Sequence, residues 1–219
     1  MAAFVIGEAM KYIIMCGGPR SYKPLRIINN ESIVGRTIRL LRENGITDVA
    51  ISSNDERYDS IGVPILHHDN PLTWEDWYWL RTFYPMDEPV CYVFGDVFFS
   101  PEAIQTIVNT ETDDIQFFAS APPFDKRYSK TWAEPFAFKV QNTKHFFAAL
   151  KTVKEWDDLG RFNRRPPIAW ELWAVIKNTA LNTPDYTNYV AINDYTIDVD
   201  DDAQAEHIRG IIGKTGAYE

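Results

Sequence analysis

Short apolar runs alternate along this chain with segments of helical periodicity, and this alternation constrains the fold more than any other feature. The apolar runs are Tyr12–Cys16, Val49–Ser52, Val90–Phe94, Ile115–Ala119, Phe136–Val140 and a shorter one near Tyr195–Ile197. A run without polar alternation is typical of a strand that is buried on both faces of a parallel sheet. The sequence therefore predicts an α/β fold, a three-layer α/β/α sandwich with a mainly parallel central sheet.

Capping signals mark the helices between these strands. Ser32 precedes a segment with apolar residues at helical spacing that runs to Asn44, and Gly45 follows as a stop. Ser100 and Pro101 have the pattern of a cap followed by the first residue of a helix. Further helices are expected at Thr143–Lys154, Ile168–Asn178 and Asp201–Gly213.

The size and composition of the chain favour one globular domain over residues 1–219, with residues 1–10 as an N-terminal extension. Hydrophobic residues make up 45% of the 219 residues, which is enough to build a core and disfavours disorder. The formal net charge of -9 disfavours non-specific nucleic-acid binding, which needs a basic surface. It leaves small phosphorylated substrates open, because a local basic pocket or a metal serves them.

The location of the protein is expected to be cytoplasmic. Cys16 and Cys91 lie inside apolar runs, which is typical of buried free thiols in a reducing compartment. The N-terminus lacks the basic start and long apolar core of a signal peptide. No stretch approaches the roughly 20 apolar residues that span a bilayer, so no membrane partner is expected.

The first predicted strand opens into a glycine turn followed by two cations. Gly17 and Gly18 come directly after the strand, and Arg20 and Lys23 follow within the next residues. Glycines let backbone N–H groups approach an anion closely, and the two cations can supply the countercharge. The pattern indicates a phosphate site, although a glycine pair followed by arginine is also common in ordinary turns.

Two aspartates follow other predicted strands. Asp96 ends the strand at Val90–Phe94, and Asp198 lies in the last apolar run. Ligands of open parallel sheets bind beyond the carboxyl ends of the strands, and carboxylate oxygens suit Mg²⁺, which keeps waters and takes phosphate oxygens as further ligands. The layout indicates a metal-bound nucleotide. An aspartate after a strand is often a cap, and Asp201 and Asp202 are interpreted as the solvated start of a helix.

Several segments in order resemble the sugar-phosphate and alcohol-phosphate nucleotidyltransferases of the nucleotide-diphosphosugar transferase (GT-A-like) fold, which include the phosphocholine cytidylyltransferases. That family carries a signature of the form GGxGTR and then PKPL, a helix, a GD pair after the central strand and a closing IDTPEDL element. The matching segments are Gly17-Gly18, Arg20, Lys23-Pro24-Leu25, the helix sequence IVGRTIRLLRENGI from Ile33 to Ile46, Gly95-Asp96 and the run from Ile197 to Ala203.

The resemblance implies a Mg²⁺-dependent nucleotidyltransferase that joins a nucleoside triphosphate to a small phosphorylated acceptor and releases pyrophosphate. The acceptor would be a sugar-1-phosphate, phosphocholine or a polyol phosphate, and the product an activated sugar or alcohol for surface polysaccharide or lipid decoration. It implies that Lys23 and Arg20 are catalytic. Asp96 and Asp198 would bind the metal. The nucleotide would be bound by Cys16, Gly17, Gly18 and Asp96.

The acceptor side is less clear from the sequence. Its candidate residues are Trp74, Trp77, Lys130, Trp132, Glu134 and Arg164. The tryptophans have the right chemistry to enclose a quaternary ammonium such as choline, and the cations to bind an acceptor phosphate. Two alternative interpretations remain. The tryptophans could pack a helix against the sheet, and the cations could lie in solvated basic loops.

The chain departs from the family signature in one place. Only Ser21 and Tyr22 separate Arg20 from Lys23, and Pro19, which has no N–H, follows the glycines. Two alternatives therefore stay open: a GT-A-type glycosyltransferase that uses a nucleotide sugar, and a non-catalytic nucleotide-binding relative. The first usually shows Asp-x-Asp after the central strand, where this chain has Asp96-Val97-Phe98.

Overall fold

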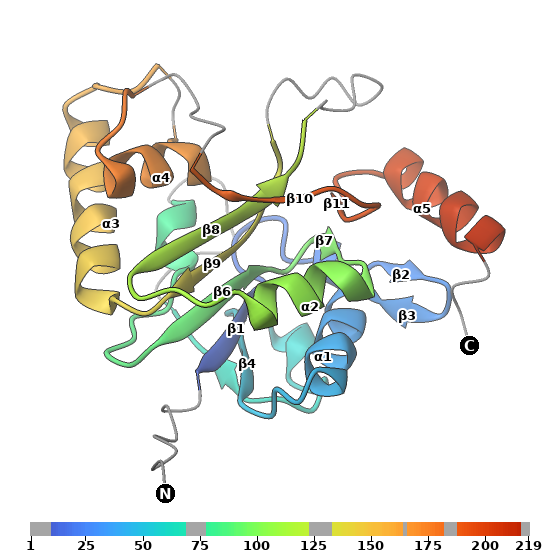
Figure 1. Cartoon of the computed structure of the whole chain (residues 1–219). Helices are drawn as coiled ribbons and strands as arrows, with labels where there is room; N and C mark the ends of the chain where they lie inside the picture. The colour runs from blue at the N-terminus through green and yellow to red at the C-terminus, as the bar shows by residue number, and fades with distance from the viewer. Residues whose placement is uncertain (1–9, 69–77, 123–132, 164–165, 182–187, 216–219) are drawn as a thin grey trace, which may run out of the picture.

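A central sheet carries helices on both faces (Figure 1) in the computed structural model, which describes residues 10–68, 78–122, 133–163, 166–181 and 188–215. The strands of this sheet are β1 (Lys11–Met15), β4 (Val49–Ser52), β5 (Ile65–Leu66), β6 (Val90–Phe94), β8 (Ile115–Ser120), β9 (Pro135–Val140) and β10 (Val190–Ile192). The helices are α1 (Ile33–Glu43), α2 (Pro101–Asn109), α3 (Thr143–Asp158), α4 (Ala169–Lys177) and α5 (Asp202–Thr215). The predicted α/β class is confirmed.

The sheet has the order β10-β8-β9-β6-β1-β4-β5, so β1 is central. Strand β1 pairs in parallel with β4 and β6, β4 pairs in parallel with β5, and β10 pairs in parallel with β8. Strand β9 is antiparallel to both of its neighbours, β6 and β8. The sheet is therefore mainly parallel, as predicted, with one reversed strand.

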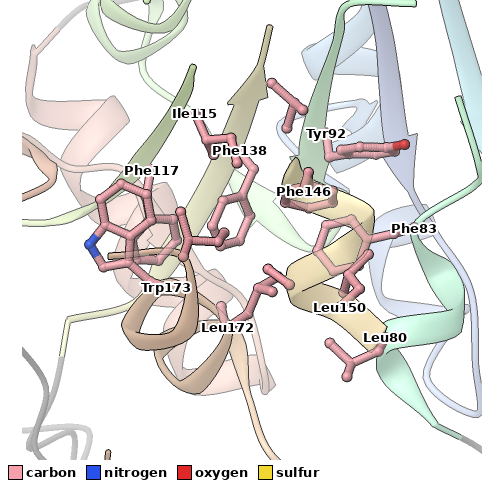
Figure 2. Packing of buried hydrophobic residues seen from close by; sticks show 14 of the residues in the cluster. Leu80, Phe83, Tyr92, Ile115, Phe117, Phe138, Phe146, Leu150, Leu172 and Trp173 are labelled. Atoms are coloured by element: carbon pink, nitrogen blue, oxygen red, sulfur yellow. The ribbon is translucent and has the colours of Figure 1, made fainter. Parts of the chain in front are cut away.

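Both faces of the sheet are buried, which explains the unbroken apolar runs. Successive side chains of β1 point to opposite faces: Ile13 and Met15 belong to the core under α3 and α4, and Tyr12 and Ile14 to the core under α1 and α2. Figure 2 shows the first of these cores, in which rings from the sheet meet rings from α3 and α4. Phe117 and Phe138 stack there with their centroids 4.5 Å apart.

The capping signals hold in the structure. The Ser32 hydroxyl accepts a hydrogen bond from Gly35 N at 3.0 Å, and the Ser100 hydroxyl accepts one from Ala103 N at 2.9 Å. Gly45 has a φ of +81°, the left-handed conformation that ends a helix with little strain in glycine. Helix α3 runs four residues beyond its predicted end at Lys154, where Lys154 pairs with Asp158 at 2.6 Å.

The last apolar run differs from the prediction. It forms β11 (Ile197–Asp198), which pairs antiparallel with β7 (Val97–Phe98) in a separate two-stranded sheet. The edge strand beside β8 is instead β10, whose Val190 and Ala191 are not fully buried. Its three residues show neither alternation nor a long apolar run, so the pattern gives no signal for it.

Both cysteines are free and buried, as predicted. Among the helices of the described residues, none combines the length and the apolar character needed to cross a membrane.

Candidate functional site

A pocket of about 370 Å³ lies where β1 and β6 end, and most of the predicted nucleotide-site residues line it. Its polar lining comprises Arg20, Ser21, Lys23, Thr82, Asp96, Asp198 and Asp200. Cys16 and Gly17 also line it. The structure thus brings together the glycine turn, both predicted catalytic cations and both predicted metal ligands.

The parallel register of β1 and β6 places the two signature segments side by side. Met15 is opposite Phe94, so the glycine turn and the Gly95-Asp96 pair leave the sheet at the same level. Gly95 N donates to Met15 O at 3.0 Å. A Cβ at Gly95 would lie 2.5 Å from that same oxygen and 2.6 Å from Cys16 Sγ, so this close approach requires glycine.

Strands β7 and β11 bring the C-terminal acids to Asp96. Asp198 is opposite Val97, and Val199 N donates to Asp96 O at 2.9 Å. Asp200 follows two residues after Asp198 and lines the same pocket. The small sheet outside the main one therefore delivers a second group of carboxylates to the end of β6.

A capping box at the start of α5 fixes the acidic run. Gln204 Oε1 accepts hydrogen bonds from Asp200 N at 2.6 Å and Asp201 N at 3.1 Å, and Gln204 N donates to Asp201 Oδ1 at 2.9 Å. Asp202 is exposed and pairs with Arg26 at 3.2 Å. Asp201 and Asp202 thus serve the start of the helix, as predicted.

Lys23 is the buried cation of the pocket, with 3% of its surface exposed. Its Nζ lies 3.3 Å from Asp96 Oδ2 and also contacts Asp200 Oδ1. Burial alone would lower the pKa of this ammonium. The nearby carboxylates of Asp96, Asp198 and Asp200 outweigh burial and hold the pKa above its ordinary value, so Lys23 is a permanent positive charge at neutral pH.

Asp200 joins the two predicted catalytic cations. Its Oδ1 contacts Lys23 and lies 3.6 Å from Arg20 Nη1, while the Arg20 side chain is about half exposed. Sequence reasoning did not include Asp200 in the site. The available signal was its spacing from Asp198, since residues two apart on an extended segment share a side.

The backbone of the glycine turn favours glycine at both positions. A Cβ at Gly17 would lie 2.4 Å from His68 Nε2 and 2.9 Å from Thr82 Cγ2. Gly18 has a φ of +82°, and its carbonyl accepts a hydrogen bond from Ser21 N at 3.1 Å. Binding of an anion by the N–H groups of this turn stays a prediction.

The predicted acceptor residues are mostly outside the described part of the chain. These are Trp74, Trp77, Lys130, Trp132 and Arg164. Glu134 is described, and its carboxylate accepts a hydrogen bond from Asp198 N at 2.8 Å. Glu134 therefore supports the segment that carries Asp198; contact with an acceptor stays a prediction.

The pocket also has an apolar part of its lining. Trp79, Phe94 and Ile168 belong to it. The Trp79 indole donates to Pro167 O, and its ring centroid lies 6.5 Å from that of Phe94. The pocket lining thus combines charged and apolar side chains.

Metal binding by Asp96 and Asp198 stays a prediction. Within the described ranges, no group of three or more His, Cys, Asp or Glu side chains is arranged to hold an ion. The donors present are carboxylate oxygens, which suit Mg²⁺, an ion that uses few protein ligands and completes its shell with water and phosphate oxygens. The donor set therefore fits this metal.

Comparison with known proteins reveals likeness in structure but not in sequence. No protein-family model matches the chain, and no curated protein matches it in sequence. Solved structures that share its fold include three with TM-scores of 0.57 to 0.58.

The first is assigned as a glucose-1-phosphate thymidylyltransferase from Bacillus anthracis, with 12% identity over 93% of this chain and 95% of that chain. The second is the 4-diphosphocytidyl-2C-methyl-D-erythritol synthase from Anaerococcus prevotii, with 10% identity over 93% and 98%. The third is the inositol-1-phosphate CTP transferase from T. maritima, with 15% identity over 95% and 97%. At these identities the likeness is one of fold, and the chain has a fold that nucleotidyltransferases share across nearly its whole length.

Proposed function

We propose that this protein is a Mg²⁺-dependent nucleotidyltransferase that joins a nucleoside triphosphate to a small phosphorylated acceptor and releases pyrophosphate. One observation carries the proposal: the buried Lys23 contacts Asp96 and Asp200 in a pocket that Arg20 and Asp198 also line. The fold shared with a thymidylyltransferase, a CTP transferase and a diphosphocytidyl-methylerythritol synthase supports it.

The reaction needs positioning and charge neutralisation more than proton transfer. An oxygen of the acceptor phosphate attacks the α-phosphorus in line, and the bond from that phosphorus to the bridging oxygen of pyrophosphate breaks. Lys23 and Arg20 supply positive charge for the oxygens of the α-phosphate and the leaving group. Because the pKa of Lys23 is raised, its role is electrostatic rather than that of a general acid.

The carboxylates of Asp96 and Asp198 would hold Mg²⁺, and with the ion bound the charge of the triphosphate is partly neutralised. Asp200 has a different part in this scheme. It contacts both cations, so the incoming phosphates take over contacts that Asp200 makes in the free protein. The ammonium and guanidinium are thereby kept converged on one point before substrate binds.

The acceptor is proposed to be a sugar-1-phosphate, a polyol phosphate or phosphocholine. The charged residues of the pocket suit phosphates, and its apolar residues, which include Trp79 and Phe94, suit a base or an alkylammonium group. The three structural neighbours carry the names of enzymes for a sugar phosphate, an erythritol derivative and an inositol phosphate.

One competing function has an observation in its favour. A non-catalytic nucleotide-binding relative would explain the short turn between Arg20 and Lys23, in which Pro19 provides no N–H to a phosphate. A glycosyltransferase is disfavoured because no second acid follows Asp96 at the end of β6.

A pyrophosphate-release assay separates these functions. ATP, GTP, CTP, UTP and dTTP are each combined with glucose-1-phosphate, phosphocholine or a polyol phosphate, in Mg²⁺ and in EDTA. We expect release with at least one pair, and only with Mg²⁺. A Mg²⁺-dependent thermal shift with a triphosphate but no release from any pair would favour the non-catalytic relative. No release and no thermal shift would contradict nucleotide binding altogether.

A further inference from the structure

Ser21 lies between the two predicted catalytic cations, and each of its polar groups is bound. Its hydroxyl donates to Asp55 Oδ2 at 2.6 Å, and its carbonyl accepts a hydrogen bond from the Tyr58 hydroxyl. Its N–H donates to Gly18 O at 3.1 Å. Ser21, Asp55 and Tyr58 are all buried. Their hydrogen bonds are therefore stronger than they would be in contact with water. We call the three residues the Ser21 clamp.

Asp55 is itself held in place. Arg57 Nε donates to Asp55 Oδ1 at 2.8 Å and Arg57 N to the same oxygen at 3.1 Å. The side-chain hydrogen bond from Arg57 is the main cause of a lowered pKa of Asp55, and the Ser21 hydroxyl adds to it. The acceptor of the Ser21 hydroxyl is therefore an ionised carboxylate, and a charge-assisted hydrogen bond is among the stronger kinds.

The clamp also reaches the start of the turn. Asp55 N donates to Ser53 Oγ at 3.1 Å, and Ser53 Oγ donates to Cys16 O at 3.0 Å. The segment after β4 thus holds the chain where it leaves β1 and again at Ser21. Between these two points lie the glycines and Arg20, so the whole short turn is anchored to one neighbouring segment.

The anchoring has a direct consequence for the cations. Ser21 N bonds to Gly18 O, and Lys23 N bonds to Arg20 O at 2.9 Å, so two successive turns overlap at Ser21. Fixing Ser21 therefore fixes the backbone that precedes and follows it. Arg20 and Lys23 leave this backbone toward the same oxygen of Asp200.

We propose that Ser21, Asp55 and Tyr58 are positioning residues that hold Lys23 and Arg20 converged in the pocket. The clamp would replace a longer phosphate-binding loop. Side-chain hydrogen bonds fix the short turn, whereas a longer loop would be fixed by additional backbone contacts. A preorganised site of this kind loses less entropy when the triphosphate binds. The catalytic consequence rests on the proposed function, but the placement of Lys23 does not.

Two variants with matched controls test the clamp. Ser21→Ala removes the hydroxyl, and Asp55→Asn removes the charged acceptor. Ser60→Ala and Asp59→Asn make the same chemical changes at exposed positions of the adjoining segment. Asp55 also caps the short 3₁₀ helix η2 (Glu56–Tyr58), whereas Ser21 does not, so Ser21→Ala is the decisive variant if Asp55→Asn lowers stability.

The first measurement needs no turnover. Each folded protein receives a brief pulse of acetic anhydride, and mass spectrometry compares acetylation of buried Lys23 with that of exposed Lys144. We expect Lys23 labelling to rise about tenfold in Ser21→Ala, the size of effect that follows from losing one buried hydrogen bond to a charged group. Both control variants should label like the wild type. Unchanged Lys23 labelling in folded Ser21→Ala would overturn the proposal.

The second measurement is a double-mutant cycle on the rate. If the clamp acts through the two cations, Ser21→Ala lowers kcat about tenfold with little change in KM in the wild type, and lowers it clearly less in Lys23→Ala, where only Arg20 remains to be positioned. Additive losses would overturn the positioning role, since a merely structural residue acts independently of Lys23. Increased labelling together with no turnover in the wild type would support the clamp and contradict the proposed function.

Discussion

Lys23 Nζ lies 3.3 Å from Asp96 Oδ2, although 73 positions separate the two residues in the chain. The contact exists because β1 and β6 are parallel neighbours and each continues into a turn at the same edge. It puts a buried positive charge beside a carboxylate at the point where a parallel sheet binds ligands.

Substitution of Lys23 should abolish most of the activity. Lys23→Ala removes the charge proposed to act on the α-phosphate, and loss of one such preorganised group lowers kcat by about 100- to 1000-fold. Lys23→Arg keeps the charge, but a planar guanidinium does not fit the same contacts, so we expect only partial activity. Steady-state kinetics measure both, and Lys151→Ala, at an exposed position of α3, is the control. Full activity in Lys23→Ala would contradict the assigned role.

Asp198 and Asp202 should differ in their effect on the metal requirement. Asp198 lines the pocket, whereas the Asp202 side chain is 95% exposed and serves the start of α5. Asp198→Asn should raise the Mg²⁺ concentration for half-maximal rate by at least about tenfold. Substitution of a residue that only hydrogen-bonds to a metal ligand already lowers metal affinity by about tenfold or more. Asp202→Asn should leave it unchanged. Equal Mg²⁺ dependence in wild type and Asp198→Asn would exclude Asp198 as a ligand.

Alanine at Gly95 should destabilise the fold and impair the site. Its Cβ would meet backbone, Met15 O at 2.5 Å, which cannot move aside as a side chain can. Overpacking of this kind costs about 1–3 kcal/mol of the free energy of unfolding. The backbone at residue 95 would have to move, and Asp96, the next residue, would move with it. Gly210→Ala is the control, because a Cβ there meets nothing within 4 Å and alanine favours the helix. Urea unfolding should separate the two variants in opposite directions.

The charge of Lys23 should persist to high pH. Its pKa is raised in the folded protein, so the stability that its charge contributes is fully present below the unfolded pKa of about 10.4 and is lost as pH rises through the higher folded value. The difference in free energy of unfolding between wild type and Lys23→Met should therefore be constant from about pH 6 to 10. A decline of that difference below pH 9 would show that the carboxylates do not outweigh burial.

Asp55 should contribute to the acid sensitivity of the protein. Its pKa is lowered by Arg57 and Ser21, so its contribution to stability is present above the unfolded pKa of about 3.9 and is lost as pH falls below that value. Unfolding of Asp55→Asn should depend less on pH below about 4 than unfolding of the wild type. Asp59→Asn should follow the wild-type curve, and an identical curve for Asp55→Asn would contradict the charged contact with Arg57.

Local patterns predicted most of the fold. The unbroken apolar runs identified the main strands because both faces of the sheet are covered, and Ser32 and Ser100 marked helix starts because their hydroxyls satisfy free N–H groups at those ends. Strand β10 was missed since three partly exposed residues carry no periodic signal. The last apolar run was interpreted as one more strand of the series, and only its pairing with β7 shows that it forms a separate small sheet.

The site was predicted in its parts but not in its connections. The resemblance named Lys23, Asp96 and Asp198, and these residues do line one pocket. Asp200 was not predicted because an acidic run before a helix is usually solvated. In the structure it contacts Lys23, and its backbone N–H is held by the side chain of Gln204. Contact of Glu134 with an acceptor stays a prediction, and only the structure shows that its carboxylate accepts a hydrogen bond from Asp198 N.

The sequence by itself determined the elements and their chemistry: strand and helix periods, the caps, the glycine turn and the types of residue placed after each strand. These are local properties, set by side-chain shape and by hydrogen bonds between near neighbours. Only the tertiary structure decided which charges meet. In the sequence, the turn at Ser21 differs from the family signature in being short, whereas the fold anchors it to Asp55 and Tyr58, more than thirty positions away. Such contacts depend on strand order and register, which no local pattern encodes.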